Sequence, residues 1–100
     1  MNLHQMAEKA LALHFEKALG PSAPPRLIAA MRHALFSGGA RIRPQLCMAV
    51  AHACGMQAPE LTQAAAVAIE MMHCASLVHD DMPAFDNADT RRGRPSVHKA

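Results

Sequence analysis

The sequence predicts an all-α fold, and three features of its composition support that prediction. Apolar residues make up 51% of the 100 residues, and helix formers such as alanine and methionine are abundant. β-branched residues are scarce and the only aromatic residues are three phenylalanines, which argues against a β-sandwich or barrel. With 18% charged residues, the chain is also too apolar to remain disordered.

Four helices follow from the apolar periodicity and from the residues that stop it. The first covers about residues 3–18, with Asn2 as its N-cap. The second starts at the prolines 24–25 and stops at Ser37–Gly39, where the glycines end it. The third and fourth are expected over 44–54, starting at a proline, and over 59–81.

The remaining segments predict how the domain is organised. Residues 82–95 are polar and are expected to form a loop, after which Ser96 is a candidate cap for a fifth helix. The helices over 44–54 and 59–81 are apolar on nearly all sides, so other helices should surround them. We therefore expect residues 1–100 to be the N-terminal portion of a single larger helical domain.

Several functional classes are disfavoured by composition. A net charge of +2 and the lack of Trp and Tyr argue against a nucleic-acid partner. Three cysteines without a C-x-x-C spacing indicate reduced thiols, and Cys74 with His73 and His79 forms no closed zinc ligand set. No signal or transit peptide is evident, and the apolar stretch 64–79 is interrupted and too short to span a membrane comfortably. A cytoplasmic protein without stable membrane insertion is expected.

Two clusters of charge oppose the helix dipole. Arg41 and Arg43 come just before the expected third helix, whereas Asp80 and Asp81 end the fourth. Such conflicts are typical of places where function overrides local stability. An anion near the arginines would resolve the first conflict, and divalent cations near the carboxylates would resolve the second.

The acidic cluster is suited to Mg²⁺, which prefers a few carboxylate ligands combined with phosphate oxygens. Pro83 should end the helix, so that Asp86 folds back towards Asp80. The alternative is a solvated acidic loop. The basic run 91–94 follows directly, and guanidinium groups beside carboxylates can hold a phosphate ester, although a solvated basic loop is also possible.

His73 precedes Asp80 by two helical turns, ~10 Å along the same face, so it is a candidate ligand contact rather than only a core residue. His79 points about 100° away from Asp80 and is expected to be structural.

Residues 70–100 resemble the first aspartate-rich region of the trans-isoprenyl diphosphate synthases. Their sequence is EMMHCASLVHDDMPAFDNADTRRGRPSVHKA. The family pattern D-D-x-x-x-x-D followed by R-R-G is met by Asp80–Asp86 and by Arg91–Gly93. The upstream GGARIRP, residues 38–44, resembles the family's G-G-K-R-x-R-P.

The resemblance implies a helical fold around a deep cavity, usually a homodimer, that uses Mg²⁺ to join an allylic diphosphate (dimethylallyl, geranyl or farnesyl) to isopentenyl diphosphate. It implies that Asp80 and Asp86 bind Mg²⁺, with Asp81 supporting them. It also implies that Arg91 binds the allylic diphosphate and that Arg43, His73 and Arg92 bind isopentenyl diphosphate.

Two features depart from the family pattern. The family lysine that helps to bind isopentenyl diphosphate is Ala40 here. A second aspartate-rich motif is absent from these residues, so we expect the segment alone to be inactive. In bacterial members a bulky residue five positions before the first aspartate limits the product to fifteen carbons. That position is the small Ala75, which favours geranylgeranyl diphosphate, with farnesyl diphosphate next and a carotenoid-type pathway as the context.

Two alternatives remain at this stage. One is a non-catalytic relative that pairs with an active synthase, which Ala40 and the short length favour and the intact aspartates and arginines oppose. The other is a helical module that binds Mg²⁺ or phosphate, which leaves the GGARIRP run unexplained.

Overall fold

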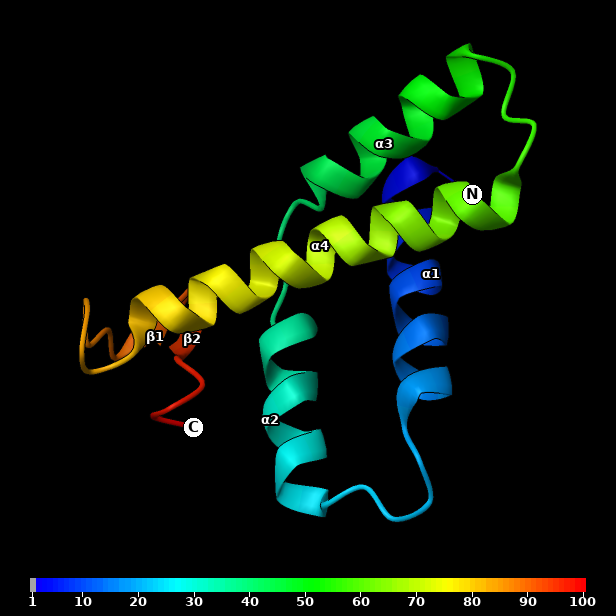
Figure 1. Ribbon diagram of the computed structural model, residues 1–100. Coiled ribbons are helices and arrows are strands. Elements are labelled where there is room, and N and C mark those ends of the chain that lie inside the picture. The colour runs from blue at the N-terminus through cyan, green and yellow to red at the C-terminus, as the bar shows by residue number, and fades with distance from the viewer. Residues whose placement is uncertain (1) are drawn as a thin grey trace. The chain divides into compact units, whose positions relative to one another are not determined.

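The computed structural model describes residues 2–100, and within them it confirms the all-α prediction (Figure 1). The described residues form four helices and one two-stranded antiparallel hairpin: α1 Leu3–Ala18, α2 Pro25–Leu35, α3 Ile42–Ala53, α4 Pro59–Asp81, β1 Thr90–Arg91 and β2 Arg94–Pro95. The chain divides into two compact units. The first comprises residues up to Gly20 together with Ala40–Glu70, and the second comprises Pro21–Gly39 and Met71–Ala100.

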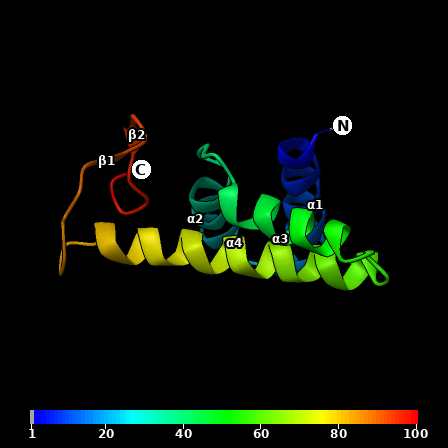
Figure 2. The same cartoon turned by 90° about the horizontal axis from the view of Figure 1, so that it is seen from above.

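The first unit is built on α1, whose start follows from its capping residues. The Asn2 side chain accepts a hydrogen bond from the Gln5 backbone N–H at 2.8 Å, and the Asn2 backbone N–H donates to the Gln5 side chain at 3.0 Å. This reciprocal capping box satisfies donors that would otherwise have no partner. α1 packs against α3, and both views place the two helices side by side (Figure 1, Figure 2). Leu11, Phe15 and Met48 are at most 2% exposed in this core.

The third helix starts earlier than the sequence predicts. α3 begins at Ile42 rather than at Pro44, so Arg43 lies inside its first turn instead of before it. Pro44 occupies the third helical position, where its missing N–H costs no helical hydrogen bond. Arg41 is the residue before the helix and adopts the left-handed conformation, with φ 55° and ψ 39°.

The second unit contains α2, the last turns of α4 and the chain beyond them. A hydrogen bond of 2.7 Å joins His33 Nε2 to the Pro95 carbonyl oxygen and so connects α2 to β2. After Ser96, residues 97–100 form one turn, in which the backbone N–H groups of Lys99 and Ala100 donate to the Ser96 carbonyl oxygen at 3.0 and 2.9 Å, and the fifth helix stays a prediction. Ser96 is buried and its hydroxyl donates to the Ala88 carbonyl at 2.6 Å, so its side chain fastens the preceding loop.

α4 is longer than the apolar stretch 64–79 on which the membrane expectation was based. Its 23 residues make it, by length and composition alone, long and apolar enough to cross a membrane, which corrects the expectation that length excludes a span. Buried core helices of soluble proteins meet the same criterion.

Candidate functional site

The C-terminal end of α4 folds back on itself, as the position of Pro83 predicts. The backbone N–H of Asp86 donates to the carbonyl oxygen of Asp80 at 3.0 Å, and that of Ala88 donates to Asp81 at 3.0 Å. The Asp80 side chain is 59% exposed, and Asp86 is exposed as well. Two carboxylates that are six positions apart in sequence are therefore brought to neighbouring backbone positions at one end of the helix.

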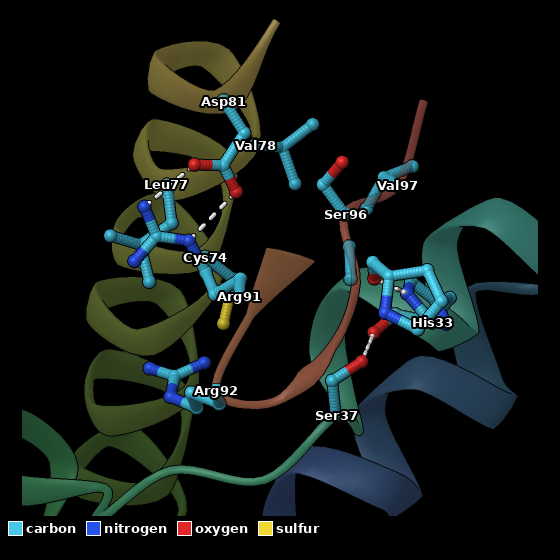
Figure 3. Close-up of a pocket in the computed structure, with 12 residues that line it drawn as sticks. His33, Ser37, Cys74, Leu77, Val78, Asp81, Arg91, Arg92, Ser96 and Val97 are labelled. Carbon is cyan, nitrogen blue, oxygen red and sulfur yellow. Dashed lines mark hydrogen bonds and ion pairs between the residues drawn. The ribbon is translucent and has the colours of Figure 1, made fainter. Parts of the chain in front are cut away.

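Asp81 faces the interior and has a different partner. Its side chain is only 5% exposed and accepts two hydrogen bonds from Arg91, Nε to Oδ2 at 2.7 Å and Nη2 to Oδ1 at 2.8 Å (Figure 3). These hydrogen bonds lower the pKa of Asp81, against the opposing effect of burial, and they raise the pKa of Arg91. The buried carboxylate thus remains charged and fixes the position of Arg91.

Arg91 retains donors for a ligand. A guanidinium group carries five N–H donors, and the pair with Asp81 engages Nε and Nη2. Among residues 2–100, no hydrogen bond of the structure involves Nη1 of Arg91, and the side chain is 34% exposed. The pair therefore positions this arginine without using all of its capacity to bind an anion.

Asp80 and Asp86 fit the requirements of Mg²⁺ better than those of a metal enclosed by protein ligands. Within residues 2–100, no group of three or more His, Cys, Asp and Glu side chains could hold a metal ion. Mg²⁺ binds through one or two carboxylates and takes its other ligands from water and phosphate. Two exposed carboxylates on a folded-back helix end match that preference. The Asp80 carboxylate lies 3.9 Å from His79 Nδ1, and the centroid of the His79 ring lies 4.4 Å from that of Phe85.

A small cavity of about 20 Å³ lies behind the Asp81–Arg91 pair, large enough for about one water molecule (Figure 3). It belongs to the second unit and is lined by residues from α2, α4 and the hairpin, including His33, Cys74 and Ser96. A cavity of this size does not accommodate a prenyl chain.

The arginines of GGARIRP have separate environments. Arg41 is 5% exposed and pairs with two carboxylates of the first unit, Glu8 and, at 3.7 Å, Glu70. These carboxylates balance its charge, so the anion that the sequence predicts is not needed at Arg41. Arg43 is exposed on the first turn of α3, where the helix dipole favours an anion.

The residues assigned to isopentenyl diphosphate are divided between the two units. Arg43 belongs to the first unit, whereas His73 and Arg92 belong to the second, so neither unit contains the whole set. His73 is half-buried on α4, and its carbonyl oxygen accepts a hydrogen bond from Ser76 at 2.6 Å. Ala75 is exposed on the same helix.

Sequence reasoning missed two features. The first is the pairing of Arg41 with Glu8 and Glu70, for which only the unusual position of a cation before a helix gave a signal. The second is the hairpin over Thr90–Pro95, which the Arg92–Gly93 pair signals weakly, since Asn-Gly and Asp-Gly are the stronger turn sequences.

The helices and the site at the end of α4 together define an all-α protein in which carboxylates and guanidinium groups gather at one helix end. The sequence profile of the polyprenyl synthetase family matches residues 24–100. The chain belongs to the polyprenyl synthetase family.

Its relatives share both sequence and fold. Geranylgeranyl diphosphate synthases of Rhodobacter capsulatus and Cereibacter sphaeroides are 59% and 52% identical over the whole chain. Farnesyl diphosphate synthase of Geobacillus stearothermophilus is 44% identical over 95% of the chain, which covers 31% of that protein. The geranyltransferase structure from Legionella pneumophila has a TM-score of 0.83 and 42% identity, covering 95% of this chain and 32% of that one. The chain spans 35% of the length of both bacterial geranylgeranyl diphosphate synthases.

Proposed function

We propose that the protein containing this chain is a trans-prenyltransferase that condenses isopentenyl diphosphate with an allylic diphosphate to make geranylgeranyl diphosphate. The observation that carries the proposal is the folded-back end of α4, where a backbone hydrogen bond joins Asp86 to Asp80 and where Asp81 holds Arg91. Identities of 59% and 52% to geranylgeranyl diphosphate synthases favour this product over farnesyl diphosphate, the alternative, whose synthase is 44% identical.

Each residue has a part that its environment supports. Asp80 and Asp86 would hold Mg²⁺, which when bound supplies positive charge to the departing diphosphate. Arg91 binds the allylic diphosphate with the donors that Asp81 leaves available, and the ion pair keeps it in place before the ligand arrives. Isopentenyl diphosphate is bound by Arg43, His73 and Arg92.

The proposed reaction also requires apolar surroundings for the prenyl chain, and the exposed apolar side chains of α4 can provide them. An allylic carbocation reacts with water unless its surroundings are apolar. Met72 is 73% exposed on α4, and the small Ala75 is exposed near it. We assign this part of α4 to the prenyl chain, with Ala75 leaving room for twenty carbons.

The assembly and setting of the protein belong to the same proposal. By analogy with the family we propose a cytoplasmic homodimer without stable membrane insertion, acting on small-molecule prenyl diphosphates in isoprenoid and carotenoid precursor synthesis. A second candidate function is that of a non-catalytic subunit that pairs with an active synthase. Ala40 favours it, because the family lysine that helps to bind isopentenyl diphosphate is missing at this position.

Product analysis of the purified full-length protein tests the proposal. The assay contains Mg²⁺, labelled isopentenyl diphosphate and each allylic primer in turn, and chromatography gives the chain length of the product. Asp80→Ala should reduce turnover by about a thousandfold or more, because a positioned metal ion contributes several kcal/mol.

Asp89→Ala is the matched control. Its carboxylate lies on the loop that follows α4, is 80% exposed and pairs with Lys99 at 3.5 Å, so turnover should be unchanged. Wild-type turnover in Asp80→Ala would refute the metal site. A wild-type protein that makes no product by itself, yet alters the product of an added synthase, would establish the non-catalytic candidate.

A further inference from the structure

The hairpin that follows the aspartate-rich segment gives its two adjacent arginines different positions. β1 and β2 pair Arg91 with Arg94, which leaves Arg92 and Gly93 as the two turn residues. Both have positive φ, 52° and 75°, as a type I′ turn requires. The turn therefore places Arg91 on the strand, where it reaches Asp81, and Arg92 at the tip, where it takes a separate direction.

The guanidinium group of Arg92 lies directly against the backbone of Gly39. A Cβ atom added to Gly39 would stand 3.1 Å from both Cζ and Nη2 of Arg92 and 3.4 Å from Nε. Three atoms of the planar group at nearly equal distance show that it lies flat over the glycine. Figure 3 shows the Arg92 side chain beside the segment that leaves Ser37, within the second unit.

We propose that Gly39 is a positioning residue: because it has no side chain, the guanidinium group of Arg92 can lie against its backbone and is held in one orientation. The inference rests on the proposed function, in which Arg92 binds isopentenyl diphosphate. An arginine on an exposed two-residue turn samples many rotamers and loses that freedom when a ligand binds. Contact with the backbone of a glycine restricts the rotamers of Arg92 before the ligand binds, so less conformational entropy is lost on binding. The same contact orients the guanidinium group.

Gly38 provides a matched control within the same segment. Gly38 and Gly39 both have positive φ, 96° and 128°, so alanine strains the backbone at either position. A Cβ atom at Gly38 would meet nothing within 4 Å. Gly38→Ala therefore reports the backbone strain alone, whereas Gly39→Ala reports the strain together with displacement of Arg92.

Steady-state kinetics of the full-length protein test the proposal. Gly39→Ala should raise the KM for isopentenyl diphosphate by up to about tenfold relative to Gly38→Ala, because a shift of the guanidinium group weakens its hydrogen bonds to the ligand without abolishing them. The KM for the allylic primer should be the same in both variants, because Arg91 is held by Asp81. In an Arg92→Ala background, Gly39→Ala should raise the KM for isopentenyl diphosphate no further than Gly38→Ala does.

Thermal unfolding of the same variants tests the contact without any substrate. Gly39→Ala should lower the melting temperature more than Gly38→Ala, and this difference should disappear when Arg92 is alanine. Equal effects of the two glycine variants, or additivity with Arg92→Ala in both measurements, would overturn the proposal. A full-length protein without synthase activity would refute the proposed function. The melting temperatures of the glycine variants, with and without Arg92→Ala, would then still test whether Gly39 positions Arg92.

Discussion

At the scale of single residues, neighbours in each charged motif do different work. Successive residues of a helix point about 100° apart. At the end of α4 this rotation leaves the Asp80 side chain 59% exposed and the Asp81 side chain 5% exposed. The hairpin separates Arg91 from Arg92 in the same way. Asp81 is thus engaged in the ion pair, whereas Asp80, Arg92 and the remaining donors of Arg91 are available to a ligand.

The Asp81–Arg91 pair makes the stability of the protein depend on pH. Because the hydrogen bonds from Arg91 lower the pKa of Asp81, the folded state binds this proton less readily than the unfolded state. The stabilisation is complete above the ordinary pKa of 3.8 and is lost as the pH falls through the lower, folded-state value. Asp81→Asn should therefore unfold more easily by about 1–3 kcal/mol at pH 7, and its difference from wild type should shrink below about pH 4.

Denaturant unfolding of the full-length protein at a series of pH values measures this difference. Asp89→Asn serves as the control, because its carboxylate is 80% exposed and its pair with Lys99 should contribute almost nothing. A difference between Asp81→Asn and wild type that stays constant from pH 7 to pH 3 would contradict the assignment.

At the scale of elements, local signals predicted the helices well because they act within a few residues. The Asn2 cap and the prolines at positions 25 and 59 mark the starts of α1, α2 and α4 as the structure has them. The prediction that α3 starts at Pro44 was wrong, because its start depends on Arg41. The left-handed conformation of Arg41 accompanies its burial against Glu8 and Glu70.

The same contrast holds for the candidate site. The fold-back of Asp86 towards Asp80 follows from one proline and was predictable. The seat of Arg92 on Gly39 joins residues more than fifty positions apart, and no local pattern in a single sequence encodes such a contact.

On α4, Ala75 is the position that we propose controls the length of the product. Ala75 is exposed among residues 2–100, so a phenylalanine there displaces none of their core residues. The larger side chain should occupy space assigned to the growing chain, and Ala75→Phe in the full-length protein should shift the product from twenty carbons to fifteen. Ala75→Ser, which adds little volume, should retain the longer product. The same chain-length distribution in all three proteins would contradict the role of Ala75.

At the scale of the whole molecule, the described residues expose many large apolar side chains. Six large apolar side chains are 54–73% exposed: Ile42, Leu46, Val50, Leu61, Met72 and Phe85. In the first unit, Leu46 and Val50 line an open apolar groove with Cys47 and Ile69. Since the chain spans 35% of the length of its relatives from Rhodobacter and Cereibacter, these surfaces are where further parts of a synthase would pack.

This exposure predicts how residues 1–100 behave when they are expressed alone. Apolar surface that nothing covers should bind a hydrophobic dye and promote self-association that increases with concentration. Glutamate at both Leu46 and Val50 should reduce dye fluorescence and shift sedimentation towards the monomer, because both side chains are more than half exposed and line the groove. Gln57→Glu adds charge at an exposed position outside that groove and is the control for charge alone. If it suppressed association as strongly as the double variant, net charge rather than the groove would be driving the self-association.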